Sequence, residues 1–202
     1  MSNLLTIPLF FIATYIYLFS FWKSLREEAP LQSIFVSELV ILATAIALSG
    51  VGLLLSSVFA PRNIFNPSHV WFHLSVVGVI LAVLFVRRFV SLSFAMISEA
   101  SVPGLLLLLA VVSRAETISV VVLLLLLGLF LLLHKTYKRI HWYKSGRPGF
   151  AAYAVVGLLF LVRIVFALSG HPMLFSIGQV DILFSAVISF LSFFLIYNQS
   201  GL

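Results

Sequence analysis

Three basic side chains that interrupt or border long apolar runs are the residues best suited to chemistry in this chain. His73 lies in HVWFHLSVVG, Arg114 lies in SRAETIS, and Arg163 opens RIVFAL. The planar guanidinium of arginine binds phosphate through two parallel hydrogen bonds, and histidine exchanges a proton near neutral pH. These residue types predict a site for an anionic ligand that carries a phosphate.

The composition indicates a membrane protein. Of the 202 residues, 62% are hydrophobic and 9% are charged, and the mean hydropathy is +1.22. A soluble domain is about 45–50% apolar and about 25% charged. We therefore expect one all-α domain (1–202) that is a polytopic integral membrane protein. The absence of cysteine from the sequence excludes disulfides, thiolate metal sites and a thiol nucleophile.

Seven apolar runs have about the length that crosses a bilayer, which is about 20 residues. The first run has no basic leader and no clear cleavage site, so we expect it to be a retained span. The predicted helices fall at roughly 4–22, 33–60, 70–86, 94–113, 117–133, 150–169 and 174–197.

The loop charges predict the orientation of these spans. The first, third and fifth loops hold nine lysines and arginines, whereas the even-numbered loops hold two. The positive-inside rule then places the odd loops in the cytoplasm, the N-terminus outside and the C-terminus inside. Because the basic residues follow this pattern, the net charge of +6 does not indicate nucleic-acid binding.

Polar residues gather on the predicted outer side of the bundle. Helices rise about 1.5 Å per residue, which allows each polar residue to be assigned a depth. Charged groups inside spans are costly and usually face a bundle interior or a water-filled cavity. The residues assigned to this outer side are His73, Arg114, Glu116, Arg163, Gln179 and Asp181.

Several of these residues also have a simpler interpretation. Arg114 and Glu116 fit ordinary loop charges. Arg163 fits a residue whose long stem reaches outward to lipid phosphates. Asp181 fits a structural bridge to Arg163 between the last two helices.

Two glutamates, Glu38 and Glu99, fall near the predicted cytoplasmic side, at about the depth of Arg87 and Arg88. We expect these carboxylates to pair with basic loop residues and to fix the packing of the helices. This predicted pairing leaves them out of the outer site.

His69 and His73 are four residues apart, which places both on one helix face and permits metal ligation. HVWFH lacks the glutamate of a metalloprotease motif, and no other motif supplies a ligand. A single hydrogen-bonded histidine is therefore the preferred interpretation, and we predict no metal and no cofactor. G-x-S-x-G and phosphate-binding loop motifs are also absent from the sequence.

Several short motifs follow one another in an order found in a known family. HLSVVG begins with His73 and ends with Gly78, where the family has H-G-G-L-x-G. A basic turn then precedes Glu99, which stands four positions before a proline, and Arg114 and Arg163 follow at similar spacings. In this order the motifs resemble those of the prolipoprotein diacylglyceryl transferases, seven-span enzymes of the bacterial membrane.

The last predicted span carries a further match. FSIGQVDILFSAVI is similar to the family's S-x-G-Q-x-L-S ending, with Ser176, Gly178 and Gln179 in the matching positions. The motifs cover most of 33–197, mainly by order and spacing.

The resemblance implies an enzyme of the bacterial plasma membrane with its site on the outer side. Phosphatidylglycerol would donate its diacylglyceryl group to the lipobox cysteine of a preprolipoprotein, and glycerol phosphate would leave. The residues implied are His73, Arg114 and Arg163 for catalysis, and Gly78, Glu116, Gln179 and Asp181 for substrate binding.

Departures from the family pattern keep two other hypotheses open. Leu74 and Ser75 replace both inner glycines of the histidine motif, and Ala167 stands where the family has a glutamate. A catalytically inactive lipid-binding or scaffold protein on the same fold would account for these losses. A small transporter would need a polar path across the membrane, whereas the predicted polar groups lie apart on its two sides.

Overall fold

The structure is a computed structural model that describes residues 6–59, 70–88, 90, 92–113, 117–140, 143, 147–169 and 179–200. Within these ranges every regular element is a helix, which confirms the predicted all-α fold. The elements are α1 (Thr6–Leu25), α2 (Leu31–Phe59), α3 (Val70–Val86), α4 (Phe94–Val112), α5 (Thr117–Thr136), the 3₁₀ turn η3 (Tyr137–Arg139), α6 (Phe150–Leu168) and α7 (Gln179–Ser200).

Most of these helices have the length and composition of membrane spans. In the described part of the chain six of them, α1, α2 and α4 to α7, are long and apolar enough to cross a bilayer. Helix α3 is equally apolar but has 17 residues, which rise about 25 Å against a hydrocarbon core of about 30 Å. A transmembrane helical protein is therefore confirmed, whereas the seventh crossing, the orientation and the single domain stay predictions.

Several helix boundaries differ from the sequence prediction by a few residues; α1, for example, ends at Leu25 rather than at 22. Helix α5 continues past residue 133 to Thr136, because basic His134 and Lys135 in its last turn are compatible with the negative end of the helix dipole. Helix α7 starts at Gln179 and runs to Ser200, whereas the prediction was 174–197. Residues 174–178 of that prediction lie outside the described residues.

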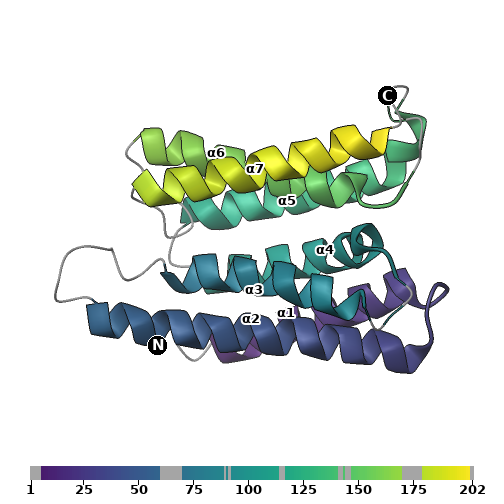
Figure 1. The fold of residues 1–202 in the computed structure, drawn as a ribbon, viewed down its shortest axis with the longest axis horizontal. Coiled ribbons are helices and arrows are strands. Elements are labelled where there is room, and N and C mark those ends of the chain that lie inside the picture. The colour runs from purple at the N-terminus through teal and green to yellow at the C-terminus, as the bar shows by residue number, and fades with distance from the viewer. Residues whose placement is uncertain are drawn as a thin grey trace.

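The helices form two layers that lie along the long axis of the molecule (Figure 1). One layer contains α1 to α4, in which α2 packs on α3 and α1 packs on α4. The other layer contains α5 to α7, in which α6 packs closely on α7. Helix α4 also contacts α5 and α6, so it joins the two layers.

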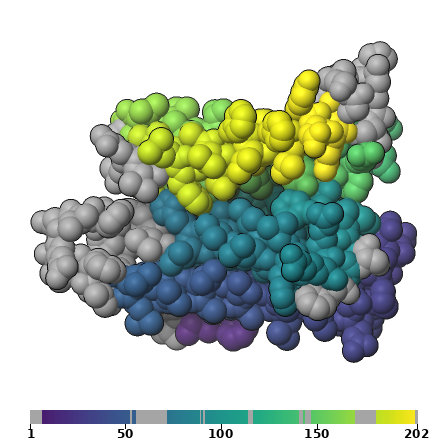
Figure 2. All heavy atoms as spheres, in the orientation of Figure 1, coloured from purple at the N-terminus to yellow at the C-terminus, as the bar shows by residue number. Residues whose placement is uncertain are grey.

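The outward faces of the helices are apolar. Figure 2 shows one face of the molecule, formed by α7, α3 and α2. Large side chains that are exposed on these helices include Leu39, Leu81, Leu183 and Phe190. Such a continuous apolar exterior is unfavourable in water but suits the hydrocarbon of a membrane.

Small residues allow two helix pairs to approach closely. Gly104 of α4 faces Tyr17 of α1, and a Cβ atom added at Gly104 would lie 2.3 Å from Tyr17 Cδ2 and 2.7 Å from its Cα. Between α6 and α7 the hydroxyl of Ser189 donates a hydrogen bond to the carbonyl of Gly157, with 3.0 Å between the two oxygens. Small residues and interhelical hydrogen bonds of this kind hold transmembrane helices together.

Candidate functional site

Three polar side chains from three helices meet at one end of the bundle. His73 lies in the first turn of α3, Asp181 lies in the first turn of α7, and Arg163 lies five residues before the end of α6. Helices α3 and α7 begin at the end of the bundle where α6 finishes, as Figure 1 shows. The topology therefore brings together a group that we call the His–Asp–Arg triad: His73, Asp181 and Arg163.

Asp181 is the centre of this triad. Its Oδ1 atom lies 2.6 Å from His73 Nε2 and 3.4 Å from Arg163 Nη2. The Arg163 side chain is 1% exposed and the Asp181 side chain 8%, whereas the His73 side chain keeps 20% of its surface exposed. One carboxylate thus contacts two basic groups, and the imidazole is the most accessible of the three.

Aromatic rings surround the triad. The guanidinium carbon of Arg163 lies 4.4 Å from the centre of the Phe72 ring, a distance at which cation–π attraction is strong in a buried site. His73 packs edge-on against Phe184 at 4.5 Å between ring centres. Phe160 contacts both Phe72 and Phe184. These rings exclude water, which strengthens the electrostatic interactions within the triad.

The triad has the elements of a base that a carboxylate orients. Nε2 of His73 lies within ion-pair distance of Asp181, and a carboxylate beside an imidazole can orient the ring as a base. Among the described residues no group of three histidine, aspartate or glutamate side chains could hold a metal ion.

The buried position of Arg163 distinguishes the two simpler interpretations of this residue, a structural bridge and a side chain that reaches lipid phosphates. The side chain points into the bundle and contacts Asp181, which is the structural bridge between α6 and α7 considered from the sequence. A guanidinium that is 1% exposed does not extend outward to lipid phosphates.

The other residues predicted for this site are placed elsewhere or lie outside the described residues. Gly78 packs α3 against α2, since an added Cβ atom would lie 2.8 Å from Leu48 Cδ1. Gln179 begins α7, and its side chain is outside the described part of the chain. The remaining predicted residues outside the described ranges are His69, Arg114, Glu116, Ser176 and Gly178.

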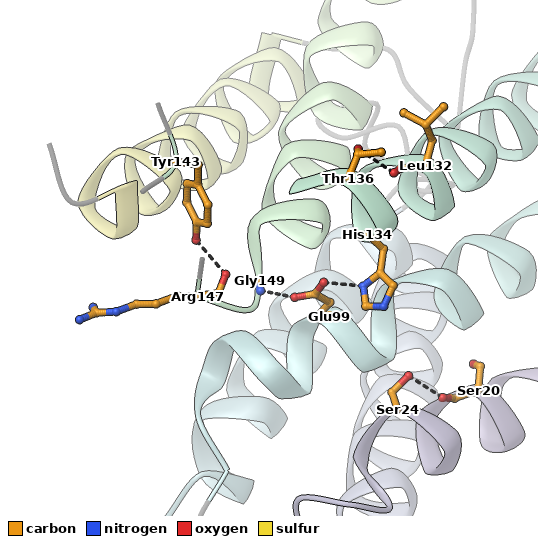
Figure 3. Close-up of polar contacts among 9 residues, drawn as sticks. All are labelled: Ser20, Ser24, Glu99, Leu132, His134, Thr136, Tyr143, Arg147 and Gly149. Carbon is orange, nitrogen blue, oxygen red and sulfur yellow. Dashed lines mark hydrogen bonds and ion pairs between the residues drawn. The ribbon is translucent and has the colours of Figure 1, made fainter. Parts of the chain in front are cut away.

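A second polar cluster lies at the opposite end of the bundle. Glu99 of α4 lies between α5 and the start of α6 (Figure 3). Its Oε1 atom lies 2.7 Å from Nδ1 of His134, and its Oε2 atom accepts a hydrogen bond from the backbone N–H of Gly149. Gly149 has a φ of 103°, a conformation that favours glycine.

The partner of Glu99 agrees with the prediction in part. The prediction was a basic loop residue; the structure supplies His134, a basic residue one position past the predicted end of the fifth span, together with a backbone donor. Within the described ranges no ion pair joins Arg87 or Arg88 to either glutamate. The sequence contained one usable signal: His134 ends a long leucine run at the depth predicted for Glu99.

Replacing Glu99 by glutamine is expected to lower the free energy of unfolding by about 1–3 kcal/mol, because the hydrogen bonds of a buried charged acceptor are weakened. Unfolding of the purified protein in detergent micelles, followed by circular dichroism, would measure the loss. Glu27→Gln is the control, because Glu27 is 84% exposed and its pair with Arg26 is on the surface. An equal effect of the two substitutions would contradict a structural role for Glu99.

Comparisons with protein-family models, with curated proteins and with solved structures find no match to this chain. The fold and composition define its class, an all-helical protein with transmembrane helices. The similarity to the prolipoprotein diacylglyceryl transferases rests on the order of the sequence motifs alone.

Proposed function

We propose that the His–Asp–Arg triad belongs to a site for a phospholipid headgroup, and that the chain transfers a diacylglyceryl group from phosphatidylglycerol to a cysteine thiol of a lipoprotein precursor. The observation that carries the proposal is the meeting of His73, Asp181 and Arg163 at one end of an apolar bundle. A phospholipid fits this position because its acyl chains can stay in hydrocarbon while its phosphate approaches the polar end.

In the proposed reaction His73 takes the proton of the acceptor thiol. The thiolate attacks the carbon of the diacylglyceryl group that is bonded to a phosphate oxygen. A carbon–sulfur bond forms as this carbon–oxygen bond breaks. Glycerol phosphate leaves with the electron pair of that bond, and the imidazolium returns the proton to it. A phosphate that enters the bundle and displaces Asp181 would bring the departing charge to Arg163, which would stabilise it. Arg114 is assigned the same role from the sequence alone.

The same geometry supports a second candidate, a lipid-binding protein without catalysis. Asp181 already compensates both basic groups, and Arg163 is enclosed by Phe72 and the helix ends. A phosphate would therefore have to compete with an internal carboxylate. A site of this kind can bind a headgroup weakly without catalysing a reaction of the lipid.

The activity can be tested with purified protein in vesicles that contain radiolabelled phosphatidylglycerol and a lipobox peptide. The wild-type protein is expected to transfer label to the peptide cysteine, and His73→Ala is expected to lower the rate about 10²–10⁴-fold through loss of the base. His134→Ala is the matched control, because it removes a histidine at the other end of the bundle.

The possible outcomes separate the two candidates. Bound phosphatidylglycerol without transfer, weakened by His73→Ala but not by His134→Ala, would favour the non-catalytic protein. Absence of both binding and transfer would overturn both proposals.

A further inference from the structure

A second carboxyl group is enclosed in the core of the α1–α4 layer. Glu38 of α2 is 1% exposed, and its neighbours on the same helix face, Ile34 and Ile41, are fully buried. Tyr17 of α1 lies close enough for the charge of Glu38 to act on it. The interior around this carboxyl is otherwise apolar, formed by the core of the α1–α4 layer.

Within the part of the chain that the structure describes, neither carboxyl oxygen of Glu38 has a hydrogen-bond or ion-pair partner. The nearby serine hydroxyls are committed to carbonyls, since Ser37 donates to Ser33 and Ser101 donates to Ile97, both at 2.7 Å. Arg87 and Arg88, at the end of α3, are exposed and form no ion pair with it. The titratable group that faces Glu38 is therefore Tyr17, which carries no positive charge.

Glu99 provides the contrast within the same protein. It is also buried, at 7% exposure, but His134 and the backbone N–H of Gly149 contact its two oxygens. An ionised carboxylate is stable in a protein interior when it has such partners. Glu38 has the burial without the partners, so the ionised form is strongly disfavoured there.

We propose that Glu38 is a proton-binding site, in which the carboxyl group is held as the neutral acid inside the core of the α1–α4 layer. The neutral form avoids the cost of an unpaired buried charge. The site lies seven residues from the start of α2, towards the end of the bundle opposite the His–Asp–Arg triad. It is thus independent of the proposed headgroup site and does not rest on the proposed function.

Infrared spectroscopy of the whole protein in vesicles tests this proposal at neutral pH. With ¹³C-labelled glutamate, the wild-type protein should show the shifted carbonyl band of a protonated carboxylic acid. Glu38→Gln should remove that band, because glutamine has nearly the same shape but no acidic proton. Glu99→Gln is the matched control and should leave the band unchanged.

Three results would overturn the proposal. They are a wild-type spectrum without the band, a band that survives Glu38→Gln, and a band that appears only after sodium is removed. The last result would indicate a metal cation in place of the proton.

Labelling with dicyclohexylcarbodiimide, which modifies protonated carboxyls in apolar surroundings, gives a readout that does not depend on a variant. An adduct is expected on the Glu38 peptide by mass spectrometry, and an adduct on Glu99 alone would contradict the assignment.

Discussion

Replacing Asp181 by asparagine is expected to lower the free energy of unfolding by about 3–5 kcal/mol, the cost of leaving one member of a buried ion pair without its partner. Arg163 is 1% exposed and its Nη2 atom lies 3.4 Å from Asp181 Oδ1, so its charge cannot reach bulk water without a rearrangement. The contact of Arg163 with the Phe72 ring would remain, but a neutral ring does not replace a carboxylate. Thermal unfolding in micelles would measure the loss.

The double variant Arg163→Met with Asp181→Asn is the informative control for this prediction. It removes the charge that Asp181 compensates, and methionine fills much of the volume of the arginine stem. Most of the lost stability should therefore return. If the double variant is as unstable as Asp181→Asn alone, the instability does not come from the buried arginine.

Gly104→Ala is expected to lower the free energy of unfolding by about 3 kcal/mol, at the upper end of the range for overpacked cores. The new Cβ atom would lie 2.7 Å from the Cα atom of Tyr17, and a backbone atom cannot move aside by a change of rotamer. Helices α1 and α4 would have to separate. A lower unfolding midpoint in micelles would record this separation.

Gly128→Ala is the matched control, because it makes the same change in the middle of a transmembrane helix. An added Cβ atom at Gly128 meets nothing within 4 Å. Alanine restricts the unfolded chain more than glycine does, so this variant should be more stable by about 0.5–1 kcal/mol. A similar loss in both variants would mean that contact with Tyr17 does not set the effect.

The helices and their class could be predicted from the sequence, because runs of about 20 apolar residues leave few alternatives to transmembrane helices. The common depth of His73, Arg163 and Asp181 followed from counting residues along helices of alternating direction. The position of Asp181 between the two basic groups did not follow from such counting. It depends on how each helix is rotated about its axis, which residue depth does not specify.

The rotation of each helix about its axis also explains why the different surroundings of the two glutamates were not predicted. Glu38 and Glu99 lie at similar depths and were expected to behave alike. Glu99 faces the contact of α4 with α5 and α6, where His134 and Gly149 supply partners. Glu38 faces an interface with few polar groups. The neighbouring helices determine whether each glutamate has a partner, and no pattern within α2 or α4 alone contains that information.

Polar contacts near both ends of α7 help to fix its rotation. Asp181 holds the first turn of the helix to α3 and α6, and Gln199 in its last turn accepts a hydrogen bond from Tyr143. These residues are 18 positions apart, which is five whole turns at about 3.6 residues per turn, so both lie on one side of the helix. One residue inserted between them would turn one of the two away by about 100°. The spacing of Asp181 and Gln199 thus helps to set which side of α7 faces lipid.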